Sequence, residues 1–241
     1  MRHYNSSVSA VRIVLLGPPG AGKGSLALLC EQRLGLAHLS TGEIFRQEIA
    51  RRSVLGRRVQ RYVAAGRLVP DALVVQVMAS RLGAMKVRRG FVLDGFPRTQ
   101  GQAAGLDQVL DRKRKPIDGA VYVTSPEALL VRRLCGRRVC SRCGANYHLR
   151  TMRPKHAGVC DHCGGSLMTR KDDQPATIRK RLALDHRTAK PLLTYYKNTG
   201  RLSTVDGRGH IETVFQRTLT LFRHRGWIDG RHDRTQVHAR N

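Results

Sequence analysis

The sequence predicts an α/β fold, in which a parallel sheet is flanked by helices. Short apolar runs bounded by glycine alternate with helical patterns along most of the 241 residues, as buried parallel strands and their crossover helices do. A glycine-rich turn directly follows the first apolar run, VRIVLL at 11–16. A stretch rich in cysteine, glycine and arginine interrupts the alternation at 136–172, which indicates an inserted module.

The first half of the chain continues with helical and strand patterns in turn. Apolar residues recur at helical spacing from Lys23 to Leu34, and AHLS at 37–40 fits a short second strand. Residues 43–65 are predicted to be helical, with Gly56 as a break. The segment 70–82 opens with Pro and Asp, which is a signal for a helix start.

Two more buried strands are predicted in the middle of the chain, at 90–94 and 119–123. Ser125 should cap the helix that follows the second of them. Pro126 would then occupy its first position, where the fixed φ of proline is tolerated.

The last part of the chain is predicted to add a long helix, a strand and a final helix. The long helix spans 175–198, and Pro191 should kink it. RLSTVDG at 201–207 contains the strand, and 211–223 the last helix.

The composition indicates contact with polyanions and no membrane segment. Lys and Arg number 44 against 17 Asp and Glu, a formal charge of +27. Such an excess indicates anionic partners, namely nucleotide, nucleic acid or an acidic surface. A generally basic solvated surface is the alternative, and it is favoured because the arginines are scattered along the chain. No window approaches the roughly 18 apolar residues of a transmembrane helix, and no signal peptide is visible. We therefore expect a cytoplasmic protein.

The turn GPPGAGKGS at 17–25 is predicted to bind phosphate. It lies between a strand and a helix, so its backbone N–H groups can form an anion nest at the positive end of the helix. Its glycines let the backbone approach phosphate without a clashing Cβ. Lys23 supplies a mobile charge for the β and γ oxygens, and Gly24 separates it from the hydroxyl of Ser25.

Four of the six cysteines form two matched pairs. Two residues separate Cys140 from Cys143, and two separate Cys160 from Cys163, with sixteen residues between the pairs. This is the spacing of a zinc ribbon, in which four thiolates hold a structural Zn²⁺. Two disulfides or a redox pair are the alternatives, although nothing in the sequence indicates the oxidising compartment that disulfides need.

Six further motifs follow the phosphate-binding turn in a fixed order. They are STGEIFR (40–46), GRLV (66–69), DGFPRTQGQ (94–102), GRR (136–138), RKDD (170–173) and IRKR (178–181). With the turn, they resemble adenylate kinase in its long-lid, zinc-binding form, over about residues 11–222. The resemblance implies a P-loop sheet with a zinc-ribbon lid and a small helical NMP-binding insertion. It also implies Mg²⁺-dependent, reversible transfer of the γ-phosphoryl group of ATP to AMP, giving two ADP.

The resemblance assigns the residues of the site. Those that would bind ATP are Gly20, Ala21, Gly22, Lys23, Gly24, Ser25, Arg133, Arg137, Asn146, Tyr147 and Gly209. Those that would bind AMP are Thr41, Arg46, Arg67, Leu68, Val69, Gly95, Phe96, Pro97, Arg98, Gln102, Arg170 and Arg181. The catalytic residues would be Lys23, Arg98, Arg133, Arg137, Arg170, Arg181 and Asp94. Because the acceptor is already an anionic phosphate oxygen, no general base is expected.

The magnesium side of the site shows small departures from the family pattern. Asp94 ends a buried strand, where a carboxylate can hold Mg²⁺ through water. Ser25 replaces an expected Thr and keeps the hydroxyl, and Leu26 replaces a Gln. Glu43 stands where an Asp is expected, and its extra methylene leaves its role open. A catalytically weakened relative would fit these departures.

The predicted division has an N-terminal extension, a core, two insertions and a tail. They are 1–10 (extension), 11–39, 70–136 and 173–225 (core), 40–69 (NMP-binding insertion), 137–172 (lid) and 226–241 (disordered tail). We expect a monomer with ATP, AMP and ADP as ligands. Kinases for CMP, UMP or GMP and a zinc-ribbon nucleic-acid-binding protein are the alternatives. The second leaves the phosphate-binding turn without a role, so nucleic acid enters only as a secondary contact.

Overall fold

A parallel sheet forms the centre of the molecule. The computed structural model describes residues 10–65, 67–85 and 89–228, and no helix within them is long and apolar enough to cross a membrane. The predicted extension (1–10) and tail (226–241) lie almost wholly outside these residues. The strand order is β2-β3-β1-β4-β8, with every neighbouring pair parallel. The strands are β1 (Val11–Leu16), β2 (Ala37–Ser40), β3 (Gly90–Asp94), β4 (Gly119–Thr124) and β8 (Leu202–Asp206).

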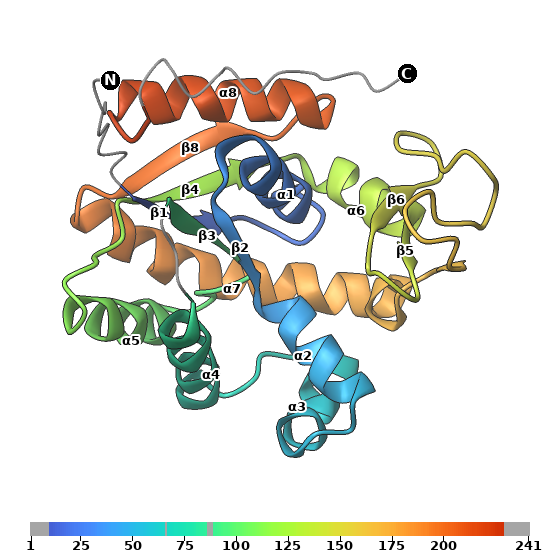
Figure 1. Cartoon of the computed structure of the whole chain (residues 1–241), viewed down its shortest axis with the longest axis horizontal. Helices are drawn as coiled ribbons and strands as arrows, with labels where there is room; N and C mark the ends of the chain where they lie inside the picture. The colour runs from blue at the N-terminus through green and yellow to red at the C-terminus, as the bar shows by residue number, and fades with distance from the viewer. Residues whose placement is uncertain (1–9, 66, 86–88, 229–241) are drawn as a thin grey trace, which may run out of the picture.

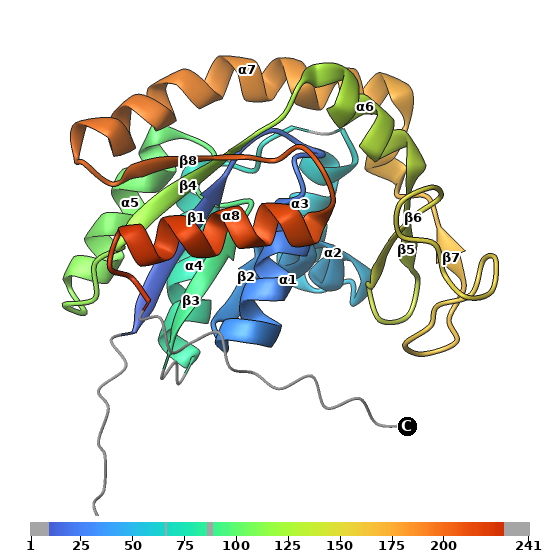
Figure 2. The same cartoon turned by 90° about the horizontal axis from the view of Figure 1, so that it is seen from above.

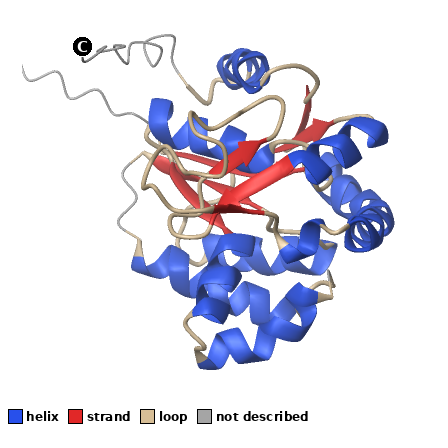
Figure 3. Cartoon of the chain, turned by 90° about the vertical axis from the view of Figure 1, so that its right-hand side faces the viewer, coloured by secondary structure: helices blue, strands red, loops and turns tan. Residues whose placement is uncertain are grey.

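Helices cover both faces of this sheet, so the predicted fold class is confirmed (Figure 1, Figure 3). They are α1 (Lys23–Leu34), α2 (Thr41–Ala50), α3 (Val54–Ala64), α4 (Asp71–Ala84), α5 (Gln100–Asp111), α6 (Glu127–Gly136), α7 (Pro175–Asn198) and α8 (Ile211–His224). Side chains of β1 alternate between two cores, as successive residues of a strand must. Ile13 packs in the core that includes α1 and α8, and Val14 in the core that includes α4, α5 and α7.

Two insertions extend from this core toward the same end of the molecule (Figure 1). The first consists of α2 and α3, directly after β2. The second is the predicted lid, with an antiparallel sheet of order β6-β5-β7. Its strands are β5 (Arg137–Cys140), β6 (Asn146–His148) and β7 (Leu167–Met168), and the 3₁₀ turn η1 (Lys171–Asp173) leads back to α7. Ligands of open parallel sheets bind outside the carboxyl ends of the strands, where the order of winding reverses. Here that point is the end of β1, between β3 and β4.

The break within the first insertion lies earlier than predicted, at residues 51–53 between α2 and α3. Ser53 caps α3, and its hydroxyl accepts a hydrogen bond from the Gly56 N–H at 2.9 Å. Gly56 is therefore inside α3 and is not the break. Its role is close packing, because an added Cβ would lie 2.1 Å from the carbonyl oxygen of Glu48 in α2.

One proline position differs in detail from the prediction, and a second lies within the long helix as predicted. Pro126 is itself the N-cap of α6, so Ser125 lies one residue before the cap. Pro191 is inside α7, which continues through it as one helix. Figure 2 shows this helix as a bowed arc across the sheet and not as two separate segments.

We expect Gly56→Ala to destabilise the fold, because the new Cβ would push α3 away from the backbone of α2. Overpacking of this kind costs about 1–3 kcal/mol, which urea unfolding would measure as a lower free energy of unfolding. Gly83→Ala is the matched control. Gly83 lies in α4, where the nearest atom to a new Cβ, Lys113 Nζ, is 3.5 Å away. An exposed helical Gly→Ala change stabilises by about 0.5–1 kcal/mol. Equal effects of the two changes would contradict the packing role of Gly56.

Candidate functional site

The glycine-rich loop between β1 and α1 packs closely against neighbouring backbone. Gly17, Gly20 and Gly22 have φ values of 134°, 85° and 97°, a region that favours glycine. A Cβ on Gly17 would lie 2.5 Å from the Val123 carbonyl oxygen. A Cβ on Gly20 would lie 2.8 Å from the carbonyl oxygen of Leu130. The loop can therefore follow this path only with glycine at these positions.

The first turn of α1 presents N–H groups and a cation to this loop. Gly22, which has no side chain, is the N-cap, so the first amide groups and the positive end of the helix dipole point toward the loop. Lys23 Nζ donates to the carbonyl oxygens of Gly17 at 2.6 Å and Pro18 at 2.9 Å. Burial lowers the pKa of Lys23 to about 8, although nearby Asp94 opposes this shift. The arrangement is that of an anion site with a movable lysine.

Asp94 ends β3 beside the start of α1. Its Oδ2 lies 3.2 Å from the position that a Cβ on Gly24 would take. His38, on β2, places its Nε2 3.9 Å from the same oxygen. Burial opposes ionisation of Asp94, but His38 and Lys23 outweigh burial, and the pKa of Asp94 is lowered. An ionised carboxylate therefore lies next to the phosphate-binding loop.

A pocket beside this loop is lined by residues from α2 to α5 and from α7. Most of the residues that the resemblance assigns to AMP line it: Thr41, Arg46, Arg67, Leu68, Val69, Gly95, Arg98, Gln102 and Arg181. Phe45, Val63 and Val74 add apolar side chains, and Asp172 adds a carboxylate. Apolar walls suit a flat base, and guanidinium groups suit a phosphate.

Hydrogen bonds fix the polar residues of this pocket. The carbonyl oxygen of Gly95 accepts from Thr41 Oγ1 at 2.9 Å and from Arg98 Nε at 2.8 Å. Gln102 Oε1 accepts from the Arg98 N–H at 2.8 Å. Gln102 Nε2 donates to Asp71 Oδ1, also at 2.8 Å. The pocket is therefore organised through its own backbone and through a carboxylate behind it.

Arg137, at the start of β5, and Arg181 of α7 converge on one buried carboxylate. Arg137 Nε and Nη2 donate to the two oxygens of Asp173 at 2.7 and 2.5 Å, and Arg181 lies 3.2 Å from the same group. The Asp173 side chain is fully buried. Arg170 Nη2 donates to Asn146 Oδ1 of the lid at 3.1 Å. Burial, followed by repulsion from two neighbouring arginines, lowers the pKa of Arg170 to about 9. Positive charge is in excess here, which favours a polyanion.

Arg133 connects the loop to the turn after β8. Its Nη2 donates to the carbonyl oxygens of Gly207 at 2.9 Å and Gly209 at 3.1 Å. Its Nη1 donates to the carbonyl oxygen of Ala21 at 3.4 Å. Three residues that the resemblance assigns to ATP, distant in sequence, are thus brought together.

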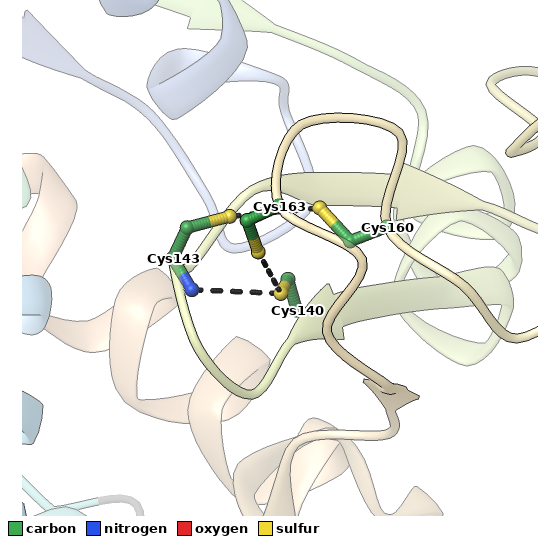
Figure 4. A group of neighbouring side chains, drawn as sticks. All are labelled: Cys140, Cys143, Cys160 and Cys163. Atoms are coloured by element: carbon green, nitrogen blue, oxygen red, sulfur yellow. Dashed lines mark hydrogen bonds between the residues drawn. The ribbon is translucent and has the colours of Figure 1, made fainter.

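The four lid cysteines form a single cluster (Figure 4). Their sulfur atoms all lie within 4.8 Å of one another, with Cys140 and Cys163 at 3.4 Å and Cys143 and Cys160 at 3.5 Å. These distances exceed the roughly 2.05 Å of a disulfide, and the cysteines are free. A metal about 2.3 Å from each of four tetrahedral sulfurs would place them about 3.8 Å apart. The N–H groups of Arg142 and Cys143 donate to Cys140 Sγ at 3.3 and 3.5 Å. The cluster therefore fits one metal ion.

Two assigned nucleotide contacts have side chains that point away from both anion sites. Tyr147 is buried in the lid, where its hydroxyl accepts from the Asp161 N–H at 2.7 Å and lies 3.4 Å from Cys160 Sγ. Phe96 is fully buried in the core that includes α4 and α5. Any contact of these two residues with a nucleotide would therefore come from their backbone.

The lid meets the first insertion at Glu43. A Cβ on Gly144, in the first cysteine turn, would lie 3.5 Å from Glu43 Oε1. The N–H of Glu43 donates to Ser40 Oγ, the cap of α2, at 3.4 Å. The structure thus places this carboxylate against the lid turn.

The sequence pattern does not reveal the charged partners of the site. Asp172 and Asp173 lie within the RKDD motif, yet their partners are Arg137 of β5 and Arg181 of α7, which lie outside that motif. Asp71 is visible only as part of a helix start, yet its carboxylate holds a pocket residue. His38 gives no signal, because its approach to Asp94 follows from the pairing of β2 with β3.

The fold and the site together define a P-loop kinase whose acceptor is itself a phosphorylated nucleoside. The loop at the end of the central strand presents Lys23 at the first turn of α1. The pocket beside it combines apolar walls with arginines.

Comparison with known proteins gives the family. The family model described as adenylate kinase matches residues 15–201. The chain belongs to the adenylate kinase family and is a nucleoside monophosphate phosphotransferase. The adenylate kinase of Clostridium tetani is 44% identical over 206 residues, 86% of this chain and 95% of that protein. That of Moorella thermoacetica is 45% identical over 204 residues, 85% of this chain and 94% of that protein.

We expect Lys23→Met to change how stability depends on pH. The pKa of Lys23 in the folded chain, about 8, lies below its ordinary value of 10.5. Between these values the unfolded chain binds more protons than the folded chain. The contribution of Lys23 to the free energy of unfolding of the wild type therefore increases as pH rises. The stability of Lys23→Met relative to wild type should therefore be greatest below about pH 8 and decline toward about pH 10. Urea unfolding at the two ends of this range measures the difference.

The control for this experiment is Lys190→Met, at an exposed lysine of α7. Both changes replace an ammonium group with a thioether, but Lys190 lies far from the loop in sequence and is not buried. A parallel pH trend in the two variants would contradict the desolvation of Lys23.

Proposed function

We propose that this chain transfers the γ-phosphoryl group of ATP to AMP, reversibly and with Mg²⁺, to give two ADP. The observation that carries the proposal is the meeting of the two anion sites. Arg98 and Arg181 line the pocket, and their charges act on Lys23 of the loop. Donor and acceptor phosphates would therefore meet between these groups. Membership of the adenylate kinase family supports the same reaction.

We assign the loop side to ATP. Residues 20–25 would surround its phosphates with backbone N–H groups, and Lys23 would exchange its carbonyl partners for phosphate oxygens. Arg133 already contacts the backbone of Ala21 and Gly209, so it would lie between the phosphates and the adenine. The remaining contacts would come from the lid side, namely Arg137, Asn146 and the backbone of Tyr147.

We assign the pocket to AMP. Arg98 and Arg46 would hold its phosphate, because guanidinium groups match phosphate oxygens in pairs. Gln102 would contact the adenine. The other assigned residues are Thr41, Arg67, Leu68, Val69, Gly95, the backbone of Phe96 and Pro97, and Arg170 and Arg181, which would bridge to the transferring group.

The chemistry of the site consists of positioning and charge neutralisation. The attacking group is an anionic phosphate oxygen, so the chain needs no base to remove a proton. Fixed arginines stabilise charge on the transferring phosphoryl group because they require little rearrangement during the reaction. The lid and the first insertion meet at Glu43 and Gly144, and this contact would exclude water from the phosphates.

Asp94 and Ser25 fit a magnesium ion. Both offer oxygen, the ligand that Mg²⁺ prefers, and both lie beside the phosphate-binding loop. The bound ion would neutralise phosphate charge. Glu43 lies against the lid turn, so we propose Asp94 as the one carboxylate, of these two, that would hold Mg²⁺.

The cysteine cluster fits a structural zinc ion. Cys140, Cys143, Cys160 and Cys163 provide four converging sulfurs, and a closed site of this kind leaves no position for a reactive water. The hydrophobic core of the lid is small, with Tyr147 and two of the cysteines as its buried members. Metal binding would therefore supply stability that apolar burial cannot.

We further propose that the lid and the NMP-binding insertion move as units. The lid would comprise 137–172 and the insertion 40–69. The core of 11–39, 70–136 and 173–225 would remain fixed, since it contains the sheet and both hydrophobic cores.

The direct test is formation of ADP from AMP and Mg·ATP in a coupled assay. We expect Arg98→Ala to lower kcat by about 10²–10³-fold, because a fixed charge next to the transferring group is lost. The control is Arg58→Ala, at an exposed arginine of α3, which should retain wild-type turnover. Wild-type turnover in Arg98→Ala would contradict its assigned role, and no ADP from the wild-type chain would overturn the proposed function.

The purified chain should contain stoichiometric zinc. Cys163→Ser should lose the metal and lower the melting temperature of the chain, because the lid depends on the ion for its rigidity. Cys135→Ser is the matched control, since Cys135 is exposed and lies outside the cluster. Elemental analysis and thermal unfolding measure the two effects. A wild-type chain with neither zinc nor a stoichiometric substitute would refute the assignment.

A further inference from the structure

The orientation of the Gln102 amide is fixed from both ends. The residue is 2% exposed and lines the pocket. Its oxygen accepts from the Arg98 N–H, and its nitrogen donates to Asp71 Oδ1, both at 2.8 Å. A backbone N–H can only donate and a carboxylate can only accept. These two partners therefore determine which end of the amide is oxygen and which is nitrogen.

Asp71 is itself held in place. It is the first residue of α4, and its second oxygen accepts from Thr99 Oγ1 at 2.7 Å. Thr99 caps α5 and accepts from the Gln102 N–H at 3.1 Å. Gly101 leaves room for the carboxylate, because a Cβ there would lie 2.8 Å from Asp71 Oδ2. The carboxylate thus joins the starts of two helices and cannot follow a rotation of the amide.

A fixed amide can recognise only one pattern of base edge. After the two bonds, one N–H and one acceptor position of Gln102 remain. Adenine presents an N6 amino donor beside an N1 acceptor, which matches them. A 6-oxopurine presents the reverse pattern, an O6 acceptor beside an N1–H donor. To accept it, the amide would have to flip, which would put its oxygen against Asp71 and its NH₂ against the Arg98 N–H.

We propose that Asp71 is a positioning residue that sets the base selectivity of the pocket for adenine over 6-oxopurines. It acts through Gln102, because the described lining of the pocket does not include Asp71. The inference rests on the proposed function, which places the base of AMP against Gln102. A buried hydrogen-bonding group left facing a group of like polarity is a strong source of discrimination.

The test compares AMP and IMP as acceptors with Mg·ATP as donor. IMP has nearly the shape of AMP but presents an acceptor at position 6 and a donor at N1. The ratio of kcat/KM for AMP to kcat/KM for IMP therefore reports which way the Gln102 amide faces. The wild-type ratio should favour AMP by about a hundredfold or more. Asp71→Asn offers an amide that can face either polarity, so only the Arg98 N–H still opposes a flip of Gln102. The variant should lower the ratio by about tenfold or more. KM for AMP should change more than kcat, because no transferring atom is touched.

Two further variants keep the test decisive. Asp111→Asn removes the same charge from the exposed end of α5 and should leave activity and ratio at wild-type values. Gly101→Ala retains Asp71 but displaces its carboxylate, and it should lower the ratio if Asp71→Asn does not fold. Thermal unfolding establishes which variants are folded, and chromatography of the nucleoside diphosphates measures both reactions.

The outcomes separate the two proposals. Equal loss of AMP and IMP activity in folded Asp71→Asn or Gly101→Ala, with an unchanged ratio, would overturn the inference and leave Asp71 a structural role. A wild-type chain that forms no ADP from AMP would overturn the proposed function. An unchanged ratio in Gln102→Leu would remove Gln102 from the base contact, and with it the premise of the inference.

Discussion

The rest of the site depends on bringing like charges together. Phosphates of two nucleotides repel each other, and so do the arginines that would hold them. The structure manages the second repulsion with a buried carboxylate, Asp173, between Arg137 and Arg181. A buried ion pair of this kind contributes little net stability, but it fixes the geometry of its members. Arg170 adds a further positive charge to this cluster, and burial, followed by repulsion from Arg137 and Arg46, lowers its pKa to about 9. The cluster is thus preorganised for an anion and not neutralised by its own acids.

The fold supplies this geometry through the carboxyl ends of three adjacent strands. β1 leads into the phosphate-binding loop, β3 into Asp94 and the turn with Arg98, and β4 toward α6 and the lid hinge. Because the strands are parallel, these three ends lie on one edge of the sheet. Glycines make the approach close, as at Gly17, whose added Cβ would meet the Val123 carbonyl at 2.5 Å. The sheet therefore places the loop and the turn that contains Arg98, whereas Arg46 lies on α2 of the first insertion.

Local patterns of the sequence predict most of this architecture. The strand at 11–16 and the helix from Lys23 to Leu34 have the predicted bounds, because apolar periodicity and glycine punctuation are both strong there. The spacing of the cysteines predicts their convergence, since each pair needs only a tight turn. The misplaced break in the first insertion concerns a tertiary contact. Gly56 is a contact point between α2 and α3, and glycine alone does not distinguish that role from a break. Tyr147 fills the lid core, which no local pattern shows.

Selectivity and phosphate chemistry use different parts of the chain. Backbone N–H groups and guanidinium groups recognise phosphate whatever base is attached. In the proposed site, the Gln102 amide would recognise the base, and Asp71 at the start of α4 would hold that amide in place. Arg98 links the two systems, because its backbone N–H orients the amide and its side chain lines the pocket. If these assignments hold, contacts between α4 and α5 would change the preferred acceptor without displacing the arginines. A shift in the turn that contains Arg98 would alter both selectivity and rate.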